Sequence, residues 1–335
     1  MTRRSTWIRR SGAGVLAVAV TGALALSLPG ASDAASARGA VPQKSYAVGP
    51  TLHLGHGSTT VGLPQYAQSL YYTSAGLLVR TNKDGSSDGG APFHFQLVKA
   101  DGKTKRLGLT LGEVVPDTDP TEPYLAWAKM KGGRIRVVVR DVRTDRNVAN
   151  VAVPGTFDWG GWSAPPVSLV GHRVYVGTND KTEVVNWRTG RAKASHTVPG
   201  SHFPDVLGRH AVVDRAHATQ VIDVASGKVL LEVSQKRRFV FVQLSPDGRF
   251  ATTSGGMGEG VTGPFKVYDL RRGTSVRLPG TDWGYGWSAN GRNVYRVEGS
   301  TMTTCAARTG TCHATRVPAL PKQPSVRYPG ILYEA

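Results

Sequence analysis

The segment PGTFDWGGWS, residues Pro154–Ser163, returns 125 residues later as PGTDWGYGWS, residues Pro279–Ser288. Two tryptophans, a carboxylate and several glycines within ten residues suit a sugar-binding loop, but a repeating fold also copies its corners without any chemical purpose. Self-similarity at a fixed period is typical of architectures that use one supersecondary unit many times. The spacing of other turns in the chain favours this second interpretation.

Six tight turns set the period of the repeat. Each follows an apolar run and contains the glycine or aspartate that a turn between antiparallel strands needs at a position of positive φ. Successive turns are on average about 42 residues apart, which is the length of a four-stranded propeller blade. The turns are Lys99–Lys103, Asp141–Asp145, Asn186–Gly190, Asp223–Gly227, Asp269–Gly273 and Ala306–Gly310.

Short β-rich runs, such as Arg134–Arg140 and Phe239–Leu244, lie between the turns, and helical periodicity is hard to find after the N-terminal segment. An additional hairpin, Pro50–Leu54 with Thr59–Leu63, precedes the first turn, and Ile331–Ala335 is strand-like. We therefore predict an all-β fold, a single β-propeller of about seven four-stranded blades over residues 46–335. The N-terminal strands and a C-terminal inner strand would share the closing blade, which pairs both edges. The alternative is six blades, with the N-terminal hairpin only capping the ring.

The N-terminal segment has the features of a secretory signal peptide. Four arginines precede an apolar run over residues 13–28, and small residues at Ala35–Ala37 form a cleavage site. The alternative is an uncleaved anchor, but about 16 apolar residues fall short of the roughly 20 that span a bilayer. We expect residues 1–37 to be a signal peptide and residues 38–45 a linker. The mature protein is then a secreted monomer, extracellular or associated with the cell wall, without a membrane span.

The chain is strongly basic. The net charge of +18 falls by three, to +15, when four arginines and Asp33 leave with the signal peptide. A field of this sign attracts polyanions such as acidic wall polymers. The alternative is that arginine content merely reflects the composition of the genome. The cluster Lys236, Arg237 and Arg238 is the predicted anion-binding site, and no aromatic-interleaved pattern indicates a nucleic-acid partner.

The only two cysteines, Cys305 and Cys312, flank one of the six turns. In an oxidising compartment such a pair is typical of a disulfide. The spacing matches no zinc or redox motif, so the sequence predicts neither a metal site nor a cofactor.

Two segments resemble known propeller families. Leu244–Phe250 (LSPDGRF), with Trp287–Arg292 (WSANGR) as a weaker copy, resembles the corner motif of TolB-like and WD-repeat propellers. Val221–Val233 resembles a quinoprotein repeat, but Leu231 stands where that family has a docking tryptophan, so no quinone is implied. Together with the signal peptide, the chain is similar to secreted WD-repeat-like propeller proteins of actinobacteria. The resemblance implies an architecture and leaves the function open.

The two repeated segments are predicted links between one blade and the next, on the same face as the loops between middle strands. Flat aromatic rings stack on sugars and carboxylates accept hydrogen bonds from hydroxyls, so these links form the candidate ligand site. The alternative is that the rings pack between blades. The candidate residues are Trp159, Trp162, Trp283, Tyr285, Trp287, Asp158 and Asp282.

Two further segments are candidates for function, but each can also be an ordinary surface loop. The glycine-rich loop Ser254–Gly263 lacks the lysine of a phosphate-binding loop, and is either a surface loop or a lid. Asp117–Glu122 offers three carboxylates, but it lacks the glycine and terminal glutamate of a helical calcium loop.

No catalytic signature is present. The sequence thus favours a binding or scaffold module at the cell envelope that recognises a protein, a glycan or an anionic wall polymer. The alternative is a propeller-based hydrolase or lyase acting on an extracellular polysaccharide, for which Asp158, Asp282 and Glu259 are the candidate carboxylates.

Overall fold

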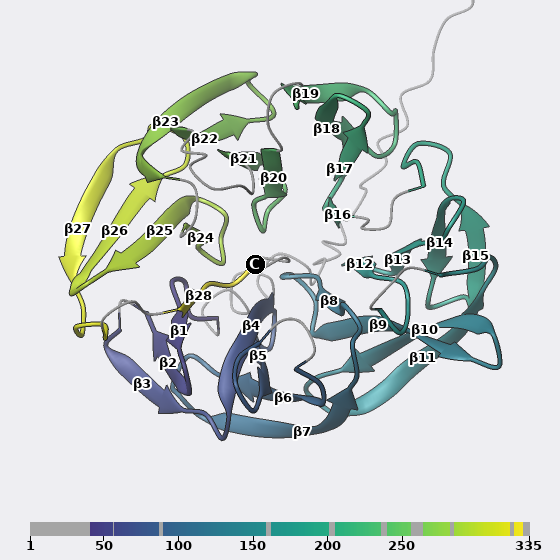
Figure 1. The fold of residues 1–335 in the computed structure, drawn as a ribbon, viewed down its shortest axis with the longest axis horizontal. Coiled ribbons are helices and arrows are strands. Elements are labelled where there is room, and N and C mark those ends of the chain that lie inside the picture. The colour runs from purple at the N-terminus through teal and green to yellow at the C-terminus, as the bar shows by residue number, and fades with distance from the viewer. Residues whose placement is uncertain are drawn as a thin grey trace, which may run out of the picture.

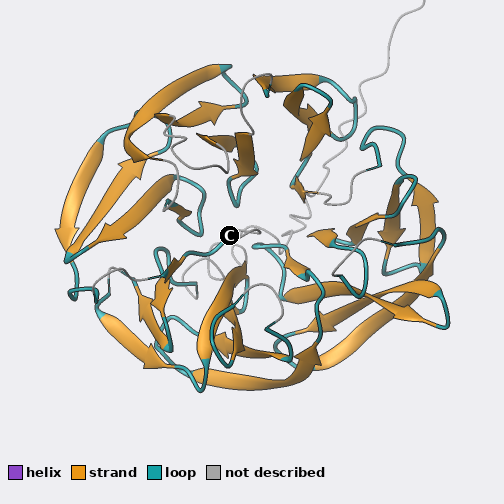
Figure 2. Ribbon diagram, in the orientation of Figure 1, coloured by secondary structure: helices purple, strands orange, loops and turns teal. Residues whose placement is uncertain are grey.

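Seven four-stranded antiparallel sheets are arranged as blades around a common centre (Figure 1). The structure is a computed structural model that describes residues 41–55, 57–86, 90–158, 162–200, 205–235, 240–255, 264–281, 285–321 and 325–330. These residues form strands, turns and loops, and no helix is found among them (Figure 2). The predicted all-β propeller with seven blades is confirmed. The predicted signal peptide lies outside the described residues.

Six blades are each built from four consecutive strands, with the first strand innermost and the fourth outermost (Figure 1). Blades 1 to 3 contain β4 (Tyr66–Thr73), β5 (Gly76–Asn82), β6 (Phe93–Val98), β7 (Thr104–Leu111), β8 (Asp117–Thr118), β9 (Tyr124–Lys131), β10 (Arg134–Asp141), β11 (Arg146–Val153), β12 (Val167–Val170), β13 (Arg173–Gly177), β14 (Thr182–Asn186) and β15 (Arg191–Ala194). Blades 4 to 6 contain β16 (Asp205–Leu207), β17 (His210–Arg215), β18 (Ala218–Asp223), β19 (Val229–Ser234), β20 (Val240–Leu244), β21 (Phe250–Gly255), β22 (Pro264–Asp269), β23 (Thr274–Thr281), β24 (Gly286–Trp287), β25 (Asn293–Glu298), β26 (Thr301–Ala306) and β27 (Cys312–Arg316).

The seventh blade is shared between the two ends of the repeat region, as predicted. Its strand order is β28 (Val326–Arg327), β1 (Tyr46–Val48), β2 (Thr51–Leu54) and β3 (Thr59–Gly62). The inner strand β28 pairs with β1 through Ala47 and Arg327. Ile331–Ala335, the segment expected to supply this inner strand, lies outside the described residues. We call this sheet the closing blade.

The burial of each strand follows its radial position. In β5, a middle strand that neighbouring blades cover on both faces, all seven residues are buried. The outer strand β7 instead alternates, with Leu107, Leu109 and Leu111 buried and Gly108 and Thr110 exposed. The middle strand β5 is thus buried along its whole length, including its polar end Arg80–Asn82, whereas β7 shows the period of two that a half-buried strand requires.

The five-residue turns that gave the period join the third and fourth strands of the blades. In four of them the first residue is Asp or Asn, whose side-chain oxygen accepts hydrogen bonds from backbone N–H groups inside the turn. The last residue has a positive φ, as at Gly227 (70°) and Gly273 (67°). Asp145 adopts the same conformation with a φ of 60°, which Asp tolerates better than most residues. What repeats along the sequence is therefore a turn with a side-chain acceptor at its first residue and a positive φ at its last.

The corner motifs that resemble TolB-like propellers have one geometry. Ser245 Oγ donates to Asp247 Oδ1 (2.6 Å) and accepts from Phe250 N (2.9 Å). Ser288 Oγ likewise donates to Asn290 Oδ1 (2.8 Å) and accepts from Asn293 N (3.0 Å). Both motifs join the first and second strands of a blade, so the weaker copy is a true structural equivalent.

Candidate functional site on the link face

The ring has two faces with different kinds of connection. We call the face that carries the turns between strands one and two, and between strands three and four, the corner face. The opposite face, which we call the link face, carries the loops between strands two and three and the links from each blade to the next. Both repeated segments of the sequence analysis are such links, β11 to β12 and β23 to β24.

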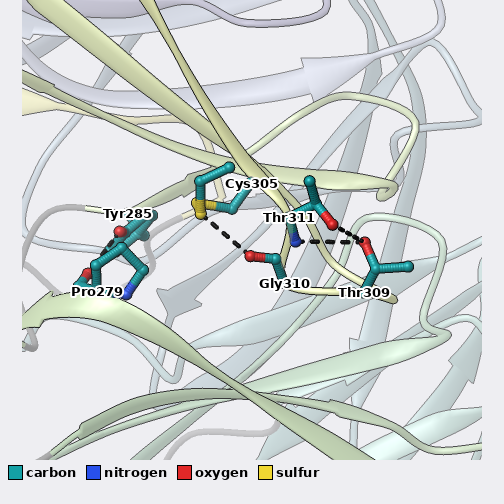
Figure 3. Close-up of a disulfide and its surroundings, with 7 residues drawn as sticks. Pro279, Tyr285, Cys305, Thr309, Gly310 and Thr311 are labelled. Carbon is teal, nitrogen blue, oxygen red and sulfur yellow. Dashed lines mark hydrogen bonds between the residues drawn. A yellow bond between two sulfur atoms is a disulfide. The ribbon is translucent and has the colours of Figure 1, made fainter.

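Two of the predicted ligand-binding rings lie in the core. Trp287 is 1% exposed and stacks on Phe250, with ring centroids 6.3 Å apart. Tyr285 is 4% exposed, stacks on Phe265 at 4.6 Å, and donates its hydroxyl hydrogen bond to Pro279 O (2.7 Å; Figure 3). Burial raises the pKa of the Tyr285 phenol. Both rings are covered by protein in this structure and contribute packing between blades 5 and 6.

The remaining predicted ligand residues divide into two groups. Trp162 is half-buried on the link face, and Asp158 is exposed there, with its backbone N donating to Asn179 Oδ1 (3.0 Å). A ligand can reach both positions. The predicted residues Trp159, Trp283, Asp282, Lys236, Arg237, Arg238 and Glu259 lie outside the described residues, as does most of the loop Ser254–Gly263.

The predicted disulfide is present. Cys305 and Cys312 are joined at an S–S distance of 2.05 Å, and they flank the turn of blade 6 on the corner face (Figure 3). This turn begins with Ala306, so it lacks the side-chain oxygen that caps four of the other turns. Among the six turns, only this one ends in glycine but begins with a residue whose side chain cannot accept hydrogen bonds from the backbone. The disulfide closes this turn.

The acidic segment Asp117–Glu122 links two blades. Asp117 Oδ2 accepts from Leu169 N (2.8 Å), and Asp119 Oδ2 accepts from Gly171 N (2.8 Å). These carboxylates in blade 2 therefore fix the inner strand β12 of blade 3. Within the part of the chain that the structure describes, no three His, Cys, Asp or Glu side chains converge in a way that could hold a metal ion.

Two half-buried carboxylates on inner strands have perturbed acidity. Burial raises the pKa of Asp117 to about 8, and the charge of Asp205 adds to this effect. Burial also raises the pKa of Asp205 to about 7, with a contribution from Asp214. Asp205 begins β16, on the other side of β12 from Asp117. Perturbed carboxylates concentrate at functional sites, although structural networks produce them as well.

The structure reveals a group of cations that the sequence analysis did not single out. The hairpin of β9 and β10 ends at Gly132–Gly133 on the link face, with Lys129, Lys131, Arg134 and Arg136 next to this turn. The sequence carried a usable signal, because KMKGGRIR alternates basic and apolar residues on both sides of a two-glycine turn. We call these four side chains the hairpin cations.

The fold is shared with solved structures at low sequence identity. The apo structure of AztD from Citrobacter koseri aligns over 85% of this chain and 98% of its own, with 10% identity and a TM-score of 0.51. PorZ, a bacterial surface component of the type-IX secretion system of Porphyromonas gingivalis, aligns over 84% of this chain and 38% of its own, with 14% identity and a TM-score of 0.50. At these identities the likeness shows the fold alone.

TolB from Acinetobacter baumannii is also similar, with 19% identity over 71% of this chain and 63% of its own and a TM-score of 0.44. No protein-family model and no curated protein matches the chain. Among the described residues, no helix is long and apolar enough to cross a membrane.

Proposed function

We propose that the protein is an exported binding or scaffold module that recognises a partner at the cell envelope through its link face. The partner classes are a protein, a glycan or an anionic wall polymer. The observation that carries this proposal is the group of hairpin cations, because the structure shows no ion pair for any of the four with a described carboxylate. Unneutralised charge of one sign on one face steers and holds an oppositely charged partner.

The disulfide and the predicted signal peptide support export, since disulfides persist in oxidising compartments. The exposed Asp158 and half-buried Trp162 on the same face support a glycan as a further partner. A propeller supplies a rigid ring for such loops, and rigid scaffolds with variable loops are a common way to build binding sites.

The test is a pull-down of the protein on purified cell wall, with and without its teichoic-type polymer, at low and at physiological salt. Retention on either wall preparation supports envelope recognition. Loss of retention in Trp159→Ala with Trp283→Ala, with an unchanged melting curve, assigns the links to binding. If this double variant unfolds, these rings pack between blades. If neither preparation retains the protein, wall glycans and anionic wall polymers are excluded as partners, and a protein is the remaining partner class.

The second candidate function is cleavage of an extracellular polysaccharide, by hydrolysis or by the elimination reaction of a lyase. The raised pKa values of Asp117 and Asp205 on inner strands favour it. A carboxyl group protonated near neutral pH can act as a general acid. We expect such an enzyme to release reducing ends from wall polysaccharide, and Asp117→Asn and Asp205→Asn to abolish this release. If the unmodified protein releases none, the candidate is removed.

A further inference from the structure

The hairpin cations all project from one side of their hairpin. Lys131 lies directly opposite Arg134, and Lys129 lies directly opposite Arg136. Residues that face each other across an antiparallel pair point to the same side of the sheet, as do residues two positions apart. The four side chains therefore form a ladder with two rungs, about 7 Å apart along the strands. The alternate residues Met130 and Ile135 point to the other side and pack on the core.

Both rungs place like charges opposite each other, an arrangement that costs stability. Arg136 donates to Asn150 Oδ1 (2.7 Å) and to Asn150 O (2.9 Å), which orients the guanidinium without neutralising it. At the tip, Gly132 and Gly133 have φ values of 57° and 72°, and a Cβ added to either would meet no atom within 4 Å. The tip therefore stands clear of the rest of the protein.

Equivalent hairpins in two other blades neutralise their cations. In blade 3, Lys181 Nζ lies 2.9 Å from Glu183 Oε1, and in blade 6, Arg296 Nη1 lies 3.0 Å from Glu298 Oε1. Both pairs sit beside the loop between strands two and three, the same place as the hairpin cations in blade 2. The fold therefore allows an ion pair at this position, and the blade 2 hairpin has none with a described carboxylate because of its own sequence.

A fifth cation lies on the facing blade. Arg80 of β5 is 5% exposed and covers the ring of Phe93 at 3.6 Å from its centroid. Its Nε is buried without a hydrogen-bond partner, and within the described ranges it forms no ion pair. Arg80 lies opposite Phe95, a residue that packs on the blade 2 side of blade 1. The hairpin cations face blade 1, as Arg140 on the same side of β10 shows by its contact with Gly108 O of β7.

A buried, unpaired guanidinium is expensive unless an anion comes to it. Glu113, which follows β7, binds Ala91 N through Oε1 and forms no ion pair with these cations. We propose that the link-face end of the boundary between blades 1 and 2 binds a linear polymer that carries a phosphate group on each repeating unit. This proposal rests on the proposed function and names the site and the chemical class of the partner.

The observations favour a polymer over a protein. Protein interfaces depend on aromatic and apolar anchors, and the exposed large hydrophobic residues of the described chain, Tyr66, Val148 and Val229, lie outside the hairpin. A small anion would engage a single rung, whereas an extended chain satisfies both. Guanidinium groups match phosphate oxygens in a bidentate geometry, so the two arginines of the ladder suit phosphate.

The experiment measures the affinity of the purified protein for poly(glycerol phosphate) at several salt concentrations, with inorganic phosphate and polyglutamate as separate probes. The variant Lys131→Gln with Arg134→Gln removes the outer rung. The matched control is Arg191→Gln with Lys193→Gln, which removes the same charge from two exposed cations of β15. We expect the first variant to bind at least about fivefold more weakly and its logarithmic salt slope to fall by about 1.4, as for two lost phosphate contacts on a single strand. The control should change neither.

Equal weakening in both variants, or unchanged affinity in the first, overturns the proposal. Tighter binding of polyglutamate than of poly(glycerol phosphate) overturns the polymer class in favour of an acidic protein. Retention on cell wall that survives in Lys131→Gln with Arg134→Gln removes the hairpin but keeps the proposed function. Absence of all retention removes the polymer site and leaves a protein as the only partner class of the proposed function.

Arg80→Leu is a second variant with a readout on folding. Because the guanidinium is buried without a counter-ion, its replacement by an apolar side chain should leave the thermal midpoint unchanged or raise it, while polymer affinity falls. A lower midpoint with unchanged affinity would show that Arg80 serves packing alone and would exclude it from the site.

Discussion

The corner-face turns and the blade 2 hairpin on the link face use charge in opposite ways. On the corner face, turn carboxylates are buried and paired: Asp223 Oδ2 lies within ion-pair distance of Arg209 Nη2, and Asp269 Oδ2 lies 3.0 Å from Arg249 Nη2. On the link face, the hairpin cations have no such partner. The same strand scaffold therefore supports charges that hold the fold on one face and charges available to a partner on the other. Substitutions on the two faces should separate stability from binding.

The largest effect is expected for Asp269→Ala on the corner face. Asp269 is 4% exposed; Oδ1 accepts from Arg271 N and Arg272 N, and Oδ2 pairs with Arg249. Its removal leaves Arg271 N without its acceptor and Arg249 without its counter-ion, whereas Arg272 N keeps its hydrogen bond to Asp269 O. Because Arg249 is partly exposed, we expect a loss of about 3 kcal/mol in the free energy of unfolding, measured by urea denaturation.

Asp101→Ala is the matched control in blade 1. Asp101 also lies in a corner-face turn, but its ion pair with Lys103 is exposed to solvent. The urea midpoint should stay unchanged, because exposed pairs contribute little. Both variants should bind the partner as before under native conditions. Loss of binding in folded Asp269→Ala would break the separation of the two faces.

The next effect concerns the turn of blade 6, where the disulfide takes the place of the missing cap. Cys305→Ser with Cys312→Ser should lower the free energy of unfolding by about 2 kcal/mol, because a short closed loop is released. Adding Ala306→Asp to this variant should restore about 1 kcal/mol by supplying the cap that other turns have. No recovery on adding the aspartate would show that the disulfide and the cap are not interchangeable.

Local chemistry explains what the sequence could predict. The turns recur because five residues suffice to define each one, so the sequence predicted the period and about seven blades, with six as the alternative. The residues of the inner strand of the closing blade were not predicted, because β28 has only two residues and pairs with Ala47, far away in the chain. The burial of Tyr285 and Trp287 agrees with the alternative of packing between blades, which the sequence could name but not decide because it depends on rings from the neighbouring blade.

The site was predicted only in outline. The link face was identified from the repeated segments, but the ladder of cations depends on the register of Lys131 opposite Arg134, which a run of residues does not show. If Gly132–Gly133 is taken as the two-residue turn of a hairpin, the residues on either side of it must lie opposite each other, and this register follows. Arg80 was hidden for a different reason, because its burial without a counter-ion arises only when two blades meet.

A pH-dependent effect is expected from Asp117, whose carboxyl group is neither in an ion pair, as on the corner face, nor exposed, as are the outer hairpin cations. Its pKa is about 8 in the folded protein and 3.8 in an unfolded chain. The unfolded state therefore loses its proton first, and the stabilising contribution is complete below about pH 4 and is lost as the pH rises to 8. Asp117→Asn should flatten this decline in a series of thermal melts. An unchanged decline would show that other groups cause it.

The smallest effect is expected from His53 in the closing blade. Burial lowers the pKa of His53 from 6.5, and its ring stacks on Tyr46 at 4.5 Å. Because the unfolded state binds the proton more tightly, this contribution to stability is complete above pH 6.5 and is lost on acidification. His53→Phe should reduce the fall of the thermal midpoint between pH 7 and pH 5. A fall of the same size in the variant would contradict the assignment.

The closing blade can form only when the chain has been synthesised as far as β28. Synthesis delivers β1 to β3 first, and their inner edge lacks its partner until residue 327 has been made. A chain interrupted anywhere in the last blades keeps that edge open, and open edges are where chaperones, proteases and other chains attach. Completion costs little extra, because loop-closure entropy grows only with the logarithm of chain length. Pairing of β28 with β1 therefore removes the edge at which an unfinished chain is open to aggregation.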